Sequence, residues 1–315
     1  CLSVEDVPGE LVQLVEACLH KDPTHRVGTD HILRVLRDIT QPELETQPSF
    51  DPSSMVTPDG ARPSPVQTTV PLRSDVFVGR ENELATLAAQ LIDADTRILT
   101  VVGAGGMGKT RLVQRFASDQ LHHYSGGAWF CDVAQANTVE GIVTAVSNGH
   151  KVPLTDKDPD TQLMGALVAR GRALVVLDNF EQVAEHAAAT IGRWTQQAPQ
   201  VQFVVTSRRS LGLAGEQLLT LSPLTETDAI QLFGERAVAF EPGFQIDDTN
   251  RATIAAIVER LDCMALAIEL AAARLRVLTV DDIHTRLSDR FKLLRGIGPG
   301  GSDRQSTLQA TIDWS

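Results

Sequence analysis

The glycine-rich stretch GAGGMGKT, residues 103–110, constrains this chain more than any other feature. It matches the phosphate-binding pattern GxxxxGK[ST] and lies between an apolar run, Ile98 to Val102, and a segment with helical periodicity. Its glycines let the loop turn backbone N–H groups toward an anion, because no side chains stand in the way. We predict a strand, a phosphate-binding loop and a helix in this order. The alternative is a glycine-rich turn without a ligand.

Three side chains are predicted to carry the chemistry of such a loop. Lys109 can reach the β- and γ-phosphates of a nucleotide, and the Thr110 hydroxyl can bind Mg²⁺. Residues 173–177 form a fully apolar run that ends in Asp178, which is typical of a strand that delivers a carboxylate beside the phosphate loop. We therefore predict Thr110 and Asp178 as magnesium ligands.

The composition excludes several functions. The 315 residues, 43% of them hydrophobic, suffice for about two domains with real cores. A net charge of −12 argues against nucleic acid or an anionic membrane as the main partner of this segment. No apolar run reaches the ~18 residues of a membrane span. The cysteines, Cys1, Cys18, Cys131 and Cys263, are too widely spaced for a metal cluster, so we expect free thiols and a cytoplasmic protein.

Hydrophobic periodicity predicts the fold class. Further apolar runs at 128–133, 201–205 and 217–221 indicate strands, and helical patterns separate them. We predict an α/β fold, a three-layer P-loop NTPase with a mainly parallel sheet, over residues 76–224. From a capping pattern at Thr225 to Asp228 onward the periodicity is helical, so an all-α domain is expected over 225–289.

The first 75 residues differ from the rest. The string CLHKDPTHR at 18–26 resembles the end of a Ser/Thr protein kinase domain, so residues 1–40 are interpreted as its last helices; the alternative is an unrelated helical hairpin. The kinase catalytic motifs do not occur in the chain, which therefore cannot phosphorylate a substrate, and we expect a piece of a longer protein. Residues 41–75 hold seven of the fifteen prolines, which predicts an extended linker.

A family resemblance begins at FVGRENEL, residues 77–84. Placed before a phosphate loop, this string resembles the opening motif of the STAND-class signalling ATPases, which include the NB-ARC proteins and bacterial AfsR- and LuxR-type regulators. In that class the turn lies against adenine and ribose. The phosphate loop and the resemblance together predict nucleotide contacts for Val78, Gly79, Arg80, Gly103, Gly105, Gly106, Met107, Gly108, Lys109, Thr110, Arg111 and Ala265.

The resemblance also implies a catalytic set of Lys109, Asp178, Glu181 and Arg208. Many relatives carry a second acid after the strand-end acid, but this chain has Asn179, whose amide cannot accept a proton from water. Glu181 can orient that water, or it can be an acid that complements a helix dipole. Arg208 resembles a sensor of the γ-phosphate; the alternative is a solvated strand-end residue.

Two further stretches resemble the same class. LDCMALAIELAA at 261–272 is similar to the LxGLPLAIELAA segment of a helical lid, in which the proline touches adenine. Cys263 and Ala265 replace that glycine and proline, which puts tight packing over the base in doubt. Residues 290–315 resemble the start of a winged-helix domain of the AfsR-type branch.

The resemblance implies an ATP/ADP-binding switch with slow Mg²⁺-dependent hydrolysis that regulates a signalling protein, expected to be a Ser/Thr kinase. One alternative is a non-hydrolysing nucleotide-binding scaffold; another is a metabolic phosphotransferase, for which no acceptor motif is visible. Expected partners are the chain's own kinase domain, C-terminal repeat or sensor domains outside this segment, and further copies in a nucleotide-dependent homo-oligomer. We expect no membrane partner and no direct nucleic-acid binding by this segment.

Overall fold

The computed structural model describes residues 67–71, 76–93, 96–153, 155 and 158–294. The kinase-like helices predicted for residues 1–40 and most of the predicted linker lie outside the described residues. The same holds for the predicted winged-helix start beyond residue 294. The domain boundaries drawn from the sequence stay predictions.

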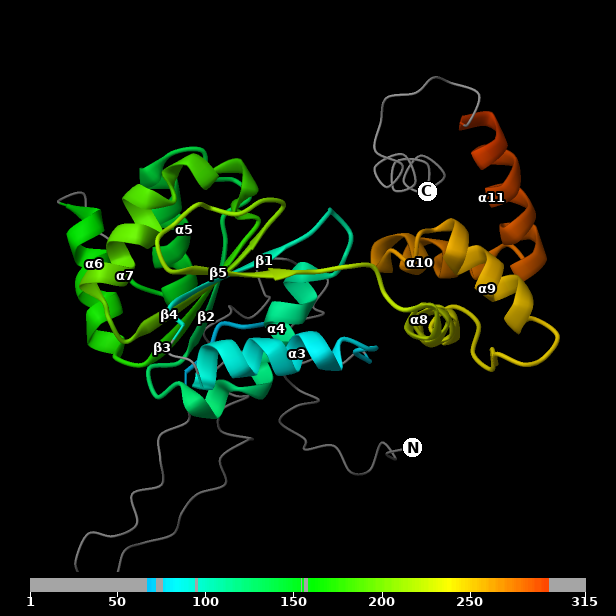
Figure 1. Ribbon diagram of the computed structural model, residues 1–315, viewed down its shortest axis with the longest axis horizontal. Helices are drawn as coiled ribbons and strands as arrows, with labels where there is room; N and C mark the ends of the chain where they lie inside the picture. The colour runs from blue at the N-terminus through cyan, green and yellow to red at the C-terminus, as the bar shows by residue number, and fades with distance from the viewer. Residues whose placement is uncertain (1–66, 72–75, 94–95, 154, 156–157, 295–315) are drawn as a thin grey trace, which may run out of the picture. The chain divides into compact units, whose positions relative to one another are not determined.

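Five parallel strands form the sheet at the centre of the described chain (Figure 1). Their spatial order is β2-β3-β4-β1-β5. Because the strands are parallel, the chain must return to the start of the sheet after each strand, and helices form most of these connections. The apolar runs that became β1, β3 and β4 are buried on both faces, as is usual inside a parallel sheet, whereas the edge strand β5 is partly exposed. The predicted α/β fold is confirmed. The strand bounds are Ile98–Val102 (β1), Ala128–Asp132 (β2), Ala173–Asp178 (β3), Val201–Ser207 (β4) and Glu216–Thr220 (β5).

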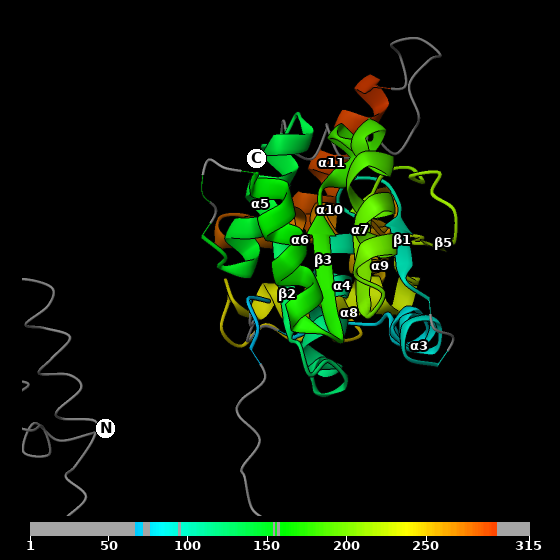
Figure 2. The same cartoon turned by 90° about the vertical axis from the view of Figure 1, so that its left-hand side faces the viewer.

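Helices cover both faces of the sheet, which makes three layers (Figures 1 and 2). On β3, Leu174 and Val176 belong to the core shared with α3 and α4, whereas Val175 and Leu177 belong to the core under α5, α6 and α7. This alternation follows from the two-residue period of a strand. The helix bounds are Glu81–Ala88 (α3), Lys109–Asp119 (α4), Val139–His150 (α5), Pro159–Arg170 (α6) and Arg193–Gln197 (α7), with short helical turns at Ala89–Asp93, Leu121–His123, Phe180–Gln182, Ala184–His186 and Ala188–Gly192.

The chain after β5 is helical. The Thr225 side chain accepts a hydrogen bond from the Asp228 N–H, so the predicted cap is present at the start of the first helix. The core of these helices is continuous with the α3 and α4 side of the sheet. No helix among the described residues combines the length and apolarity needed to cross a bilayer. The bounds are Glu226–Val238 (α8), Arg251–Arg260 (α9), Ala265–Ala272 (α10), Ala273–Arg276 (a short turn) and Val280–Leu294 (α11).

The end of the predicted linker pairs with the edge of the sheet. The Ala128 N–H donates to the Gln67 carbonyl at 3.2 Å, and the Thr69 N–H donates to the Ala128 carbonyl at 3.1 Å. These residues form a parallel bridge to β2. An edge strand offers unpaired backbone groups, and the β-branched side chains of Thr68, Thr69 and Val70 suit an extended backbone.

A buried histidine lies beside this edge. His150 is fully buried at the end of α5 and stacks on Trp129, with 5.0 Å between ring centroids. Neither ring nitrogen has a hydrogen-bond partner within the described part of the chain. Burial, and then the charge of Arg170, lowers the pKa of His150 to about 3. The folded chain therefore holds a neutral imidazole at neutral pH.

This histidine should make folding sensitive to acid. Between about pH 6.5 and 3 the unfolded chain binds a proton at His150 that the folded chain does not, so the free energy of unfolding falls as the pH falls, by up to about 1.4 kcal/mol per pH unit. His150→Phe should remove this component and keep the stack on Trp129. Urea unfolding at pH 7.5 and pH 5.0 measures it, with the exposed His123→Phe as control. Equal pH slopes for His150→Phe and the parent chain would contradict the argument.

Candidate functional site

The glycine-rich loop leaves β1 and runs directly into α4. The Gly103 N–H donates to the Ser207 carbonyl at 3.3 Å, which fixes the loop to the neighbouring strand β4. Gly106 and Gly108 have φ angles of 77° and 89°, in the region that favours glycine. A Cβ on Gly108 would meet no atom within 4 Å, so the backbone conformation, not packing, requires this glycine. The loop presents its backbone at the N-terminus of α4, where an anion is favoured.

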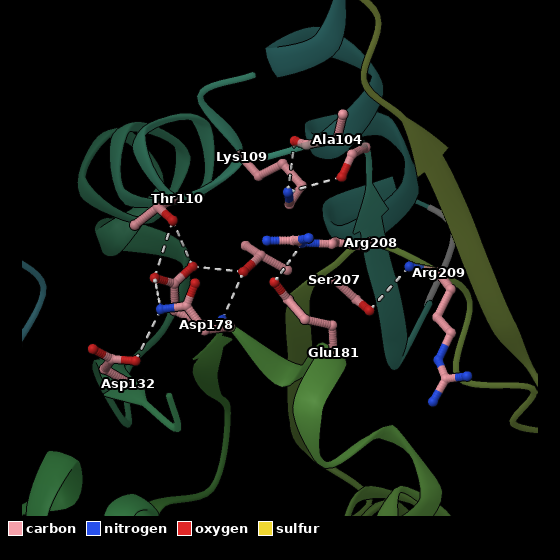
Figure 3. Close-up of polar contacts among 12 residues, drawn as sticks. Ala104, Lys109, Thr110, Asp132, Asp178, Glu181, Ser207, Arg208 and Arg209 are labelled. Atoms are coloured by element: carbon pink, nitrogen blue, oxygen red, sulfur yellow. Dashed lines mark hydrogen bonds and ion pairs between the residues drawn. The ribbon is translucent and has the colours of Figure 1, made fainter. Parts of the chain in front are cut away.

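Lys109 folds over the loop (Figure 3). Its ammonium donates to the carbonyl oxygens of Gly103 at 2.9 Å and Ala104 at 3.0 Å. Burial lowers the pKa of Lys109, and the nearby Glu181 carboxylate opposes that shift. The lysine charge thus lies within the loop predicted to hold phosphates.

Asp178 is the most connected acid of the site. Its side chain is 3% exposed and accepts hydrogen bonds from the hydroxyls of Thr110 at 2.7 Å and Thr206 at 2.6 Å. Burial raises the pKa of Asp178, and the two threonine hydrogen bonds act in the opposite direction. Three elements, α4, β3 and β4, therefore meet at one carboxylate.

The residues present fit a magnesium–nucleotide complex. Thr110 and Asp178, the two predicted ligands, are in direct contact through hard oxygen atoms, which are the donors that Mg²⁺ prefers. No group of three or more His, Cys, Asp or Glu side chains that could hold a metal occurs among the described residues. In a magnesium–nucleotide complex, phosphates and water would supply the remaining ligands.

Glu181 and Arg208 meet at the mouth of the loop. Arg208 follows the last residue of β4, and its Nε lies 3.2 Å from Oε1 of Glu181 in the turn Phe180–Gln182. The arginine side chain is 59% exposed. Figure 3 shows both residues beside Lys109. All four residues of the predicted catalytic set, Lys109, Asp178, Glu181 and Arg208, are thus gathered at one end of the sheet.

The sequence prediction missed Asp132. The Asn179 side-chain amide donates to Oδ1 of Asp132 at 3.0 Å and to Oδ2 of Asp178 at 3.2 Å, so it bridges two carboxylates. Asp132 is the last residue of β2 and lies opposite Asp178 in the parallel register. An acid at the end of an apolar run, like Asp178 itself, was the available signal.

The predicted opening motif lies between the loop and the helices after β5. Gly79 has a φ of 65°, in the region that favours glycine, and a Cβ there would come within 2.7 Å of the Asp228 carboxyl. Arg80 is 8% exposed; its guanidinium donates to the carbonyls of Ser222 at 2.7 Å and Met107 at 3.4 Å. Val78 is buried. Their predicted contacts with adenine stay predictions, whereas Arg80 already joins the phosphate loop to a distant segment.

The helix α10 also touches the phosphate loop. The Leu266 N–H, next to the predicted Ala265, donates to the Gly106 carbonyl at 3.0 Å. The Arg111 guanidinium lies 3.2 Å from Glu269, which also pairs with Arg236 at 3.0 Å. The first turn of α10 and the loop are therefore neighbours, as a lid would require.

Comparison with known proteins assigns the family. The NB-ARC domain family matches residues 80–240, more than half of the chain. The chain belongs to the NB-ARC family. The matched residues form a nucleotide-binding signalling module and include the phosphate loop, Asp178 and Arg208. The predicted resemblance to NB-ARC proteins is confirmed.

The chain is also similar to individual curated proteins and solved structures. The uncharacterized protein Rv0894 of Mycobacterium tuberculosis is 34% identical over 76% of this chain, and the chain spans 61% of that relative. The regulatory protein AfsR of Streptomyces griseus is 27% identical over 90% of this chain, which spans 28% of AfsR. A STAND protein with a tetratricopeptide repeat sensor from Pyrococcus horikoshii is 14% identical, with a TM-score of 0.45, over 79% of this chain and 41% of that structure.

Arg80 provides a test of how the NB-ARC site is held together. Arg80→Ala should lower the free energy of unfolding by about 1.5–3 kcal/mol, because two carbonyls lose a charged hydrogen-bond donor. Arg115→Ala is the matched control, since Arg115 pairs with Asp119 on an exposed helix face, where an ion pair contributes about 0–1 kcal/mol. Urea unfolding measures both variants. If both variants lost the same free energy of unfolding, the hydrogen bonds of Arg80 would contribute no more to stability than an exposed ion pair.

Proposed function

We propose that this NB-ARC module is a nucleotide-operated switch that binds ATP or ADP with Mg²⁺ and hydrolyses ATP slowly. The observation that carries the proposal is the hydrogen bond from the Leu266 N–H to the Gly106 carbonyl, which joins α10 to the phosphate loop. A change in what the loop holds then acts directly on the helices after β5. Such coupling is what a switch needs, because a ligand shifts a conformational equilibrium only through differential contacts.

In the proposed site each residue has one task. The loop N–H groups and Lys109 bind the phosphates, and Thr110 and Asp178 hold the metal. When bound, Mg²⁺ neutralises phosphate charge. Arg208 exchanges its contact with Glu181 for the γ-phosphate, so it distinguishes ATP from ADP. Catalysis then requires only positioning and charge stabilisation.

The role in the whole protein is also a proposal, because the chain spans only 61% of Rv0894 and 28% of AfsR. We infer that the module regulates a cytoplasmic signalling protein, with the kinase-like helices of residues 1–40 belonging to a Ser/Thr kinase domain. Sensor or repeat domains beyond residue 315 receive the signal. Nucleotide exchange then drives assembly into a homo-oligomer.

A second function has one observation in its favour. Asn179 occupies the place directly after Asp178, and its amide cannot take a proton from water. A non-hydrolysing scaffold that holds its nucleotide permanently would need no acid there. Steady-state phosphate release from ATP by the purified chain separates the two functions. The switch should release phosphate slowly, and the scaffold should release none.

Removal of Lys109 should abolish nucleotide binding. In the parent chain, ATP–Mg²⁺ at a hundredfold excess over Kd should stabilise the fold by about 2.7 kcal/mol, and Lys109→Ala should lose that gain. Lys151→Asn is the control: it also removes a lysine, at a left-handed position that asparagine tolerates. Thermal unfolding with and without nucleotide is the measurement. If ATP–Mg²⁺ stabilised Lys109→Ala as much as the parent chain, the phosphate loop would be ruled out as the binding site.

Removal of Arg208 should narrow the difference between ATP and ADP affinity. The lost contact is a charge-assisted hydrogen bond of about 1.5–3 kcal/mol made only to the γ-phosphate, so ATP affinity should fall while ADP affinity stays. Arg209→Ala is the neighbouring control, since Arg209 points away from Lys109 in Figure 3. Isothermal titration with each nucleotide gives the ratio. An unaltered ratio in Arg208→Ala would eliminate this residue as the sensor.

A further inference from the structure

The Asp178 carboxylate receives a hydrogen bond from a threonine that does not belong to the phosphate loop or its helix. Thr206, the last residue but one of β4, donates through its hydroxyl to Oδ1 of Asp178 at 2.6 Å. Thr110 of α4 donates to the same oxygen at 2.7 Å (Figure 3). Thr206 is only 1% exposed. The proposed metal ligand Asp178 is therefore held from the sheet as well as from the loop helix.

The direction of the Thr206 hydroxyl is set by its second contact. The backbone N–H of Asn179 donates to the Thr206 oxygen at 3.0 Å. A hydroxyl carries one proton, and an N–H at its oxygen occupies a lone pair, so the proton is left to point at Asp178. The first residue of the turn after β3 thus orients the hydroxyl that supports the last residue of β3.

A second buried threonine of the sheet provides a comparison. Thr100 lies on the neighbouring strand β1, opposite Val205, and is fully buried. Its hydroxyl oxygen has no hydrogen-bond partner within the described part of the chain. Thr100 and Thr206 therefore share their residue type, their burial and their sheet, and they differ in the contact with the proposed metal ligand.

We propose that Thr206 is a positioning residue of the magnesium site: its hydroxyl fixes the orientation of the Asp178 carboxylate that is to hold the metal. The inference rests on the proposed binding of a Mg²⁺–nucleotide complex, and it adds a residue outside the phosphate loop to that site. Mg²⁺ demands near-ideal octahedral geometry, so a carboxylate that can rotate holds it less well. Removal of a group that hydrogen-bonds a metal ligand typically costs 10–100-fold in metal affinity.

Thr206 is suited to this task because it lies in the sheet. Thr110 is itself a proposed metal ligand and follows Lys109 directly, so its contacts change when nucleotide binds. Thr206 lies on a strand that pairs with β3 on one side and with β1 on the other, where Val101 is its partner in the register. The hydrogen bond from Thr206 to Asp178 therefore stays in place with and without a ligand.

The first test removes the hydroxyl and keeps the shape of the side chain. Binding of a non-hydrolysable ATP analogue is measured by isothermal titration at a series of free Mg²⁺ concentrations. Thr206→Val should raise the Mg²⁺ concentration at the midpoint about 10–100-fold, while the affinity for the analogue in EDTA stays at the parent value. Thr100→Val is the matched control, and its midpoint should equal that of the parent chain.

The second test restores the donor in a smaller side chain. Thr206→Ser keeps the hydroxyl and loses the methyl group, so it should return the Mg²⁺ midpoint to the parent value. If Thr206 mattered only for packing, serine would be the worse substitute, because valine retains the volume and serine leaves a cavity. Should Thr206→Val fail to fold in urea unfolding experiments, Thr206→Ala replaces it, since its smaller side chain leaves room for a water at the Asn179 N–H.

The outcomes distinguish this inference from the proposed function. A parent-like Mg²⁺ midpoint in Thr206→Val, or an equal rise in Thr206→Ser or Thr100→Val, would overturn the role of Thr206 and leave the nucleotide switch intact. A parent chain that binds the analogue equally well with Mg²⁺ and in EDTA would overturn both this inference and the metal site of the proposed function. A parent chain that binds no nucleotide would overturn the proposed function itself.

Discussion

The hydrogen bonds to Asp178 are the interactions on which the site depends. A carboxylate that is 3% exposed loses most of its hydration, and burial raises its pKa. The hydroxyls of Thr110 and Thr206 replace part of that hydration and favour the ionised form. Because these donors come from α4 and β4, the buried carboxylate receives both hydrogen bonds only when the loop helix and the two strands are assembled. The same contacts therefore hold the proposed metal ligands and join these three elements of the fold.

A second set of contacts connects the phosphate loop to the helices after β5. Arg80 holds carbonyls that are far apart in sequence, Met107 in the loop and Ser222 after β5. The Gly106 carbonyl accepts from the first turn of α10, and Glu269 of the same helix meets Arg111 of α4. The Arg80 guanidinium and the first turn of α10 thus both contact the backbone of the phosphate loop. A rearrangement of the loop must break or remake these hydrogen bonds.

The sequence predicts the local parts of this arrangement well. The strands, the loop, the cap at Thr225 and the acid Asp178 all follow from patterns within a few residues, where period and spacing determine the structure. The change from glycine to Cys263 is also local: Cys263 has a φ of 50°, so it keeps the left-handed turn at a cost of roughly 1–2 kcal/mol. Ala265 begins α10, the first helical position where proline is common, and an alanine fits there without strain.

Long-range pairings lie beyond such patterns. The contact of Asn179 with Asp132 depends on the register of two strands separated by two helices, and nothing in either segment specifies that register alone. The bridge from Arg80 to Ser222 joins residues 142 positions apart. The pairing of Gln67–Val70 with β2 likewise requires an edge that exists only after the sheet forms. In each case tertiary geometry selects one partner for a group whose chemistry the sequence shows.

Energies decide how such a module can switch. Inverting a two-state equilibrium from 1:99 to 99:1 requires about 5.5 kcal/mol of differential binding, whereas the one charge-assisted contact proposed for Arg208 would supply about 1.5–3 kcal/mol. The Arg208 side chain is 59% exposed but that of Glu181 only 20%, so release of Arg208 leaves a mostly buried carboxylate without this partner and adds to the requirement. The remainder must come from contacts that change together with it, and the backbone hydrogen bond between Gly106 and Leu266 and the Glu269 ion pairs are placed to do so. In the proposed switch, Arg208 therefore biases the module, and the contacts of the loop with α10 complete the change.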